Sequence, residues 1–182
     1  MLAGLVPSLA SAADREGLYG FADIGVTAIQ AESTVDGVRR EETASPTSMR
    51  LGAGYRVNRH FAVEGDLHSV LKKAEFGAMG SVGNQGVRVA ALGILPIGDQ
   101  FELLGKASVG AEWSDWSRAE PWVAVDKRSF SLGLGVGARY WINDHAAVRL
   151  DIDGINRDEF VAASTKHKFN MGSTTLGFQY RF

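Results

Sequence analysis

The 182-residue sequence contains no cysteine, which excludes both a disulfide framework and thiol chemistry. No apolar run approaches the ~20 residues that a membrane-spanning helix requires. The formal net charge is only −2, so nothing points to nucleic acid as a partner. The length suits a single domain with a proper core or a closed sheet. These absences exclude a disulfide-rich scaffold and a helical membrane protein.

Glycine, by contrast, is abundant: it makes up 22 of the 182 residues, whereas its average share in proteins is near 7%. Most of it lies within runs of alternating apolar and polar residues, where glycine weakens a strand unless crowding or curvature requires it. Alternation with a period of two is typical of β-strands, and no stretch has a helical period. We therefore expect an all-β protein.

The clearest alternation runs from Phe130 to Ile155 and is interrupted by Asn143-Asp144-His145. This pattern predicts two strands joined by a three-residue turn. Residues 57–66 repeat residues 142–151 in the same register, sharing Asn, His, Ala-Val and Asp. The chain therefore uses one β-unit twice.

Eight strands are predicted in total. Their residue ranges are 17–30, 49–57, 61–68, 87–95, 101–113, 130–140, 146–155 and 175–182. Long loops at residues 31–46, 71–85, 114–128 and 156–168 alternate with short turns. Eight consecutive antiparallel strands can close into an up-and-down barrel without an exposed edge. An even number of strands places both termini at the short-turn end.

The polar faces of the strands carry seven acidic and seven basic residues. They are Asp23, Glu64, Asp66, Glu102, Glu112, Asp151 and Asp153, with Arg50, Arg56, Arg88, Lys106, Arg139, Arg149 and Arg181. Such a balance suits a closed lumen, because an unpaired charge there is costly. Two barrels fit the strand count: a soluble lipocalin-like barrel with its apolar face inside, and a transmembrane β-barrel with that face outside.

Aromatic residues gather near the strand ends and favour the membrane alternative. Those near the short-turn ends are Tyr55, Phe61, Phe101, Tyr140, Trp141, Tyr180 and Phe182, and those at the opposite ends are Trp113 and Phe130. Two aromatic belts are typical of membrane interfaces. In a membrane with the faces reversed, each basic residue at the midplane would cost ~2–4 kcal/mol, so the apolar face must point outward.

Three segments resemble the small outer-membrane β-barrel family of the OmpA/OmpX or opacity-protein type: residues 51–58, 135–143 and 177–182. The resemblance covers residues 17–182 and implies a monomeric Gram-negative outer-membrane protein of the porin family with both termini in the periplasm. It also implies that the final strand, ending in Phe182, is an assembly signal for the barrel-assembly machinery. Residues 1–13, with Ala10-Ser11-Ala12, resemble the remnant of a secretory signal peptide.

No catalytic, cofactor or metal site is predicted. The four histidines, His60, His68, His145 and His167, include no pair with the spacing of metal ligands. His68 and Ser69 suggest a lipid hydrolase, but adjacent residues of a strand face opposite ways and cannot act together. We therefore expect a protein that is not an enzyme.

Eight strands leave an interior just wide enough for side chains to fill, so we expect salt bridges to plug the lumen. The expected role is structural, or surface interaction through four long extracellular loops. The alternatives are a narrow channel for small solutes, a barrel enzyme acting on envelope lipids, and a soluble lipocalin-like ligand-binding barrel. Expected partners are outer-membrane lipid, lipopolysaccharide phosphates near Lys72, Lys73, Lys166 and Lys168, and an extracellular ligand of the loops.

Overall fold

The computed structural model describes residues 15–35, 38–71, 74–75, 81–117, 126–157 and 169–182. The predicted signal-peptide remnant at residues 1–13 lies outside these ranges. The strands are β1 Gly17–Val35, β2 Val38–Ala44, β3 Thr47–Asn58, β4 Phe61–Val70, β5 Ala74–Glu75, β6 Ser81–Ile97, β7 Phe101–Ser117, β8 Asp126–Trp141, β9 Ala146–Arg157 and β10 Phe169–Arg181. Among the residues described, no helix is long and apolar enough to cross a membrane.

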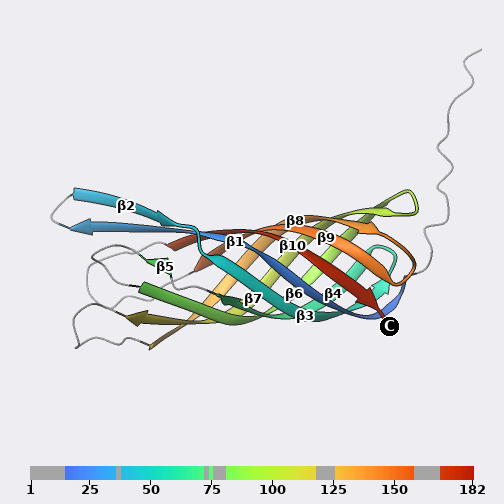
Figure 1. Ribbon diagram of the computed structural model, residues 1–182, viewed down its shortest axis with the longest axis horizontal. Coiled ribbons are helices and arrows are strands. Elements are labelled where there is room, and N and C mark those ends of the chain that lie inside the picture. The colour runs from blue at the N-terminus through green and yellow to red at the C-terminus, as the bar shows by residue number, and fades with distance from the viewer. Residues whose placement is uncertain (1–14, 36–37, 72–73, 76–80, 118–125, 158–168) are drawn as a thin grey trace, which may run out of the picture.

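Eight of these strands form the wall of a closed antiparallel barrel, in the order β1-β3-β4-β6-β7-β8-β9-β10 (Figure 1). The last strand pairs back onto the first, from Tyr19 opposite Arg181 to Ala31 opposite Phe169. Closure leaves no unpaired edge in the wall. The predicted eight-stranded up-and-down barrel is therefore confirmed.

The predicted loop over residues 31–46 is wrong, because most of it is a β-hairpin. Strand β1 continues to Val35 and pairs with β2 from Ile29 opposite Ala44 to Val35 opposite Val38. This hairpin projects beyond the barrel (Figure 1). The period-two signal arises where one face of a strand is buried, so backbone pairing beyond the wall gives no such pattern.

The other three predicted loops are shorter than expected for the same reason. Paired strand extends into each of them, so β6 begins at Ser81, β7 ends at Ser117 and β8 begins at Asp126. The short strand β5 also pairs with the start of β6. The remaining residues of these loops other than Leu71 lie outside the described ranges, and they include Lys72, Lys73, Lys166 and Lys168.

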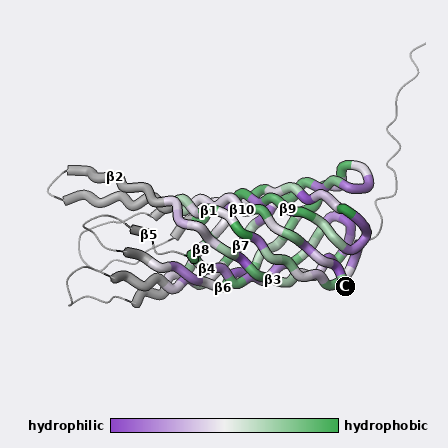
Figure 2. The backbone as a smooth tube through the Cα atoms, in the orientation of Figure 1, coloured by the Kyte–Doolittle hydropathy of each residue, from purple (hydrophilic) through white to green (hydrophobic). Residues whose placement is uncertain are grey.

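The apolar face of the wall points outward and the polar face points into the bore. Leu134 is 74% exposed, whereas Arg149 and Asp151 are 0% exposed. Figure 2 shows hydrophobic and hydrophilic residues alternating along the strands of the wall. A soluble lipocalin-like barrel requires the reverse arrangement, so that alternative is wrong.

The two copies of the predicted repeat form equivalent turns at one end of the barrel, which we call the short-turn end; the opposite end is the loop end. The side-chain oxygen of Asn58 accepts a hydrogen bond from the backbone N–H of His60 at 2.8 Å, and that of Asn143 accepts one from His145 at 2.9 Å. This is the local bonding for which Asn is favoured in turns. In the third turn Gly98 adopts a φ of +70°, which side-chain-bearing residues rarely adopt.

Candidate functional site: the charged bore

The bore contains the side chains of thirteen of the fourteen predicted lumen charges, each at most 6% exposed. They are Asp23, Arg50, Arg56, Glu64, Asp66, Arg88, Glu102, Lys106, Glu112, Arg139, Arg149, Asp151 and Asp153. They come from seven strands and meet because alternation turns every second side chain inward. The bore is therefore filled by ionic groups that neutralise one another.

Ion pairs cross the middle of the bore. Arg149 on β9 donates two parallel hydrogen bonds to Glu64, from Nη1 to Oε1 at 2.9 Å and from Nη2 to Oε2 at 3.0 Å. Strands β9 and β4 lie on opposite sides of the barrel. A bidentate arginine–carboxylate pair is among the strongest charge-assisted contacts, so this pair braces one wall against the other.

On the loop-end side of the Arg149–Glu64 pair, Arg50 forms hydrogen bonds with three carboxylates. Its Nε donates to Asp23 at 2.7 Å, Nη2 donates to Asp151 at 2.8 Å, and Nη1 donates to Asp153 at 3.1 Å. Lys106 lies 2.9 Å from Oδ1 of Asp151 and 3.2 Å from Oδ1 of Asp153. Each charged group here has an opposite charge in contact, which offsets the desolvation penalty of burial.

Two buried aromatic side chains, which were not predicted as site residues, fill the space between these ions. Tyr19 donates its hydroxyl to Oε1 of Glu64 at 3.0 Å, and the Phe21 ring lies 4.2 Å from the guanidinium of Arg149. Glycine opposite each ring makes the room: a Cβ on Gly52 would overlap Phe21, and one on Gly54 would overlap Tyr19. The absence of side chains in the Gly-x-Gly motif of β3 therefore leaves room for these two aromatic rings in the bore.

At the short-turn end of the bore, three arginine side chains surround Glu102. This carboxylate accepts hydrogen bonds from Arg56 at 2.7 Å and from Arg139 at 3.2 Å. Arg15, which precedes β1 and was not predicted, stacks on the Trp141 ring at 4.6 Å and lies 3.8 Å from Glu102. Burial lowers the pKa of the Arg15 guanidinium, and the nearby Glu102 opposes that shift.

The prediction of Trp141 as a membrane-interface aromatic is wrong. Its side chain is 1% exposed and lies inside the barrel, while its neighbour Tyr140 points outward and is 49% exposed. The two residues are adjacent in one strand, so their side chains must face opposite ways. The inward position of Trp141 follows from the same alternation that buries Arg139.

The predicted lumen charge Arg181 is in the inward register, opposite Tyr19, but it is half-buried at the end of the bore and not enclosed in it. This residue ends β10, and its Nε donates to the backbone carbonyl of Asp144 in an exposed turn at 3.0 Å. It therefore belongs to the rim of the short-turn end. Alternation specifies the face of a residue but not whether the wall extends far enough to cover it.

Of the other predicted belt residues, Tyr55, Phe61, Phe101, Phe130, Tyr140, Tyr180 and Phe182 are exposed on the outside, and Trp113 is half-buried. All of them except Trp113 and Phe130 lie at the short-turn end, as predicted. Trp113 and Phe130 lie toward the loop end but inside their strands, because β7 continues to Ser117 and β8 begins at Asp126. Gly20 faces the Phe182 ring, whose nearest atom would be 3.7 Å from a Cβ at that position. The outer surface is thus apolar along the wall and aromatic at its ends.

At the loop end a histidine lies between two carboxylates. The Nδ1 atom of His68 is 3.4 Å from Asp66, and its Nε2 atom is 2.9 Å from Glu112. Asp66 also accepts from Arg88 at 3.2 Å, and Glu112 accepts from Ser131 at 3.2 Å. Both ring nitrogens are therefore engaged by acids and neither contacts Ser69, which removes the geometry that a histidine–serine hydrolase needs.

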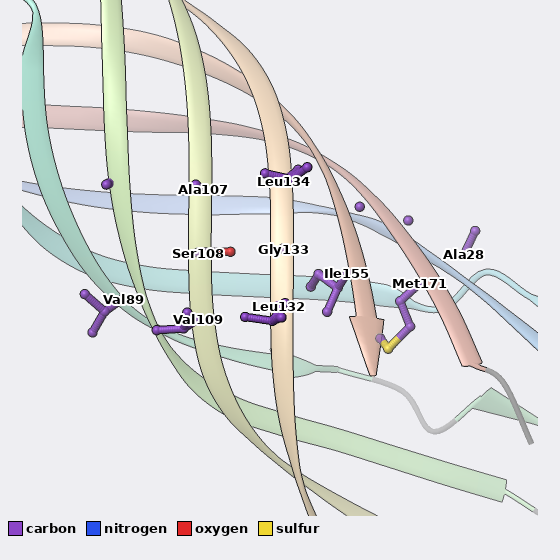
Figure 3. Close-up of a pocket in the computed structure, with 13 residues that line it drawn as sticks. Ala28, Val89, Ala107, Ser108, Val109, Leu132, Gly133, Leu134, Ile155 and Met171 are labelled. Atoms are coloured by element: carbon purple, nitrogen blue, oxygen red, sulfur yellow. The ribbon is translucent and has the colours of Figure 1, made fainter. Parts of the chain in front are cut away.

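A cavity of about 40 Å³ lies at the loop end, lined by residues that include Thr27, Arg50, Asn84 and Met171. A larger space of about 1000 Å³ is lined by residues from β6 round to β1 (Figure 3). Its lining includes the exposed Leu132 and Leu134 and the buried Ser108, Ile155 and Met171. No group of three or more His, Cys, Asp or Glu side chains within the described ranges has the geometry of a metal site.

The chain was compared with protein families, curated sequences and solved structures. The model of the family described as "Outer membrane protein beta-barrel domain" matches residues 1–182. Neisserial surface protein A is similar in structure, with a TM-score of 0.64 and 18% identity over 91% of this chain and 97% of that one. No curated protein sequence matches the chain significantly.

Two further solved structures are similar. The attachment invasion locus protein Ail of Yersinia pestis has a TM-score of 0.58 and 18% identity, covering 92% of this chain and 99% of that one. The outer membrane protein OprG of Pseudomonas aeruginosa has a TM-score of 0.56 and 15% identity, covering 92% of this chain and 96% of that one. At these identities the likeness is one of fold.

Proposed function

Because the chain belongs to the outer membrane protein β-barrel family, we propose that it is a non-conducting outer-membrane barrel with a structural and surface-interaction role. The main observation that supports this proposal is the bore filled by ion pairs. Arg149 and Glu64 join opposite walls, and Arg50 joins β3 to β1 and β9. A solute crossing the bore would have to break several buried ion pairs at once.

Planar-bilayer recording tests the closed bore. The wild-type protein should give no discrete current steps in either polarity. The narrow-channel alternative predicts steps that disappear when Arg139 and Asp151 are neutralised by Arg139→Gln and Asp151→Asn. Such steps would overturn the proposal, provided that both variants still form folded barrels on gels.

The surface-interaction role is assigned to the loop end. The paired β1–β2 hairpin extends the wall there, and β6, β7 and β8 also extend beyond their predicted ends. With both termini in the periplasm, as the family resemblance implies, the loop end faces the exterior. Loops carried on a rigid scaffold are common sites of recognition.

The chemistry of the surface partner is constrained by the charge of the loops. The Yersinia pestis Ail protein has been crystallised in complex with sucrose octasulfate, a heparin analogue. In the present chain, residues 31–46, 71–85, 114–128 and 156–168 carry ten basic and ten acidic residues. Because these charges cancel, recognition by net positive charge is not favoured, and we propose a partner bound through specific loop contacts.

Shortening the hairpin tests the surface role. Ala31 pairs with Glu42, so residues 32–41 can be replaced by a two-residue Asn-Gly turn without disturbing the wall. Adhesion of cells expressing this variant to matrix-coated plates should fall, while the barrel stays folded. Unchanged adhesion, with wild-type adhesion above that of cells lacking the protein, would argue against this hairpin as the binding element.

A further inference from the structure

The short-turn end of the bore has more cationic than anionic groups. Arg15, Arg56 and Arg139 all approach Glu102, whose two oxygens are already bonded to Arg56 and Arg139. The next carboxylate inward, Glu64, forms two hydrogen bonds with Arg149 instead. Three guanidinium groups therefore contact Glu102, while Glu64, which lies 3.7 Å from Arg139, is already bonded to Arg149. The side chains of the three arginines are at most 6% exposed.

The same end holds N–H groups without acceptors. In the described part of the chain, every buried side-chain N–H group that lacks a hydrogen-bond partner belongs to Arg15, Arg59, Arg139 or Trp141. These groups are Nε of Arg15, Nε of Arg59, Nε and Nη2 of Arg139, and Nε1 of Trp141. Oε1 of Gln179, which also lacks a partner, lies opposite Ala147 and so near Trp141, but one acceptor cannot match all of these donors. Buried donors are normally paired, so several at one place indicate a missing acceptor.

The unpaired atoms of Arg139 have the arrangement that recognises an oxyanion. Nε and Nη2 lie along one edge of a planar guanidinium, a spacing that matches two oxygens of a carboxylate or a phosphate. Nη2 is 3.7 Å from Oε1 of Glu64, which is too long for a hydrogen bond. Arg15 and Arg139 lie 4.6 Å and 5.8 Å from the centre of the Trp141 ring, so the three side chains form one cluster.

We propose that Arg15, Arg139 and Trp141 form a binding site for a small oxyanion, such as phosphate or a carboxylate, at the short-turn end of the bore. The anion would accept the unpaired N–H groups and match the excess guanidinium charge. Arg15 precedes β1, so its backbone is not part of the barrel wall. Its side chain is held by a hydrogen bond to the carbonyl of Asp99 at 2.6 Å and by the Trp141 ring, and it can shift to let the anion enter. The three side chains of the site are buried inside the barrel, away from the outer surface that lipid covers, so the proposed ligand is a free anion and not a lipid headgroup.

Isothermal titration calorimetry tests the site. Inorganic phosphate is added to the full-length folded protein in zwitterionic detergent at constant ionic strength. The wild-type protein should show saturable binding. Arg15→Gln should weaken it roughly tenfold or more, since a hydrogen bond to a charged group is lost. Trp141→Phe keeps the ring beneath Arg15 but removes its donor, and should weaken binding about threefold to tenfold.

Arg181→Gln is the matched control, because Arg181 carries the same charge at the same end but lies on the rim. Its binding constant should fall by less than that of Arg15→Gln, because Arg181 acts on the site through longer-range electrostatics and not through a hydrogen bond to the anion. Absence of saturable binding to the wild type would overturn the proposal, as would equal weakening by Arg181→Gln and Arg15→Gln. Binding seen only when vesicles of anionic lipid replace phosphate would assign the anion to lipid headgroups and would also overturn it.

Discussion

His145 and Arg181 exchange two hydrogen bonds at the short-turn end: the backbone N–H of Arg181 donates to the carbonyl of His145 at 2.7 Å, and Nδ1 of His145 bonds the carbonyl of Arg181 at 3.0 Å. His60 and Ile94 form the same pair of bonds, at 2.8 Å and 3.1 Å. Because a carbonyl can only accept, Nδ1 carries the proton in both rings. The repeated histidine therefore ties each turn to the neighbouring strand.

Replacing either histidine should weaken the barrel slightly. His145→Ala and His60→Ala should each lower the free energy of unfolding by about 0.5–1.5 kcal/mol, since each removes one side-chain hydrogen bond. Urea unfolding in lipid vesicles measures this loss. The two effects should add in the double variant because the turns share no contacts. A loss that is present in one variant and absent in the other would show that the two turns are not equivalent.

Breaking the brace across the bore should have a much larger effect. Glu64→Ala leaves Arg149 buried without its bidentate partner and should lower the free energy of unfolding by about 3–5 kcal/mol. Replacing both residues by methionine removes both charges and should lower it less than the single substitution. Urea unfolding of the two variants and the wild type checks this order. A double variant less stable than Glu64→Ala would show that the ion pair, rather than charge balance, stabilises the bore.

The glycines opposite the buried rings can be tested against a glycine on the outer surface. Gly52→Ala should lower the free energy of unfolding by about 1–3 kcal/mol, because its Cβ would overlap the Phe21 ring and the backbone carbonyl oxygen of Gly65. Gly105→Ala is the control, since a Cβ there meets nothing within 4 Å. Equal stability of the two variants would contradict the steric account. Replacing Phe21 by leucine should restore part of the stability lost in Gly52→Ala.

Fluorescence can show whether the side chains of Trp113 and Trp141 face the lipid or the bore. In proteins retaining a single tryptophan, brominated lipids should quench Trp113 strongly and Trp141 weakly, because Trp141 is 1% exposed inside the barrel. Strong quenching of Trp141 would restore its predicted place in the outer aromatic belt. A folded barrel in both proteins, verified on gels, is the control.

Period-two alternation was enough to predict eight strands, their closure and the face of nearly every residue in the wall. It succeeded because each wall strand separates an apolar surface from a charged bore, so the sequence carries the pattern. It failed for the β1–β2 hairpin, where backbone pairing continues beyond the wall. The error at Trp141 arose because this residue was assigned by its position at a strand end and not by alternation, which places it inward beside the outward-facing Tyr140.

The sequence by itself determined that this chain is a barrel with its apolar face outward and balanced charges on the other face. Only the tertiary structure decided which charges meet, because Arg149 and Glu64 are 85 residues apart and pair through barrel closure. The sequence likewise could not show that Arg15 enters the short-turn end, or that Gly52 and Gly54 make room for rings from β1. Alternation specifies a direction for each side chain, whereas a contact across the bore depends on the register and closure of all eight strands.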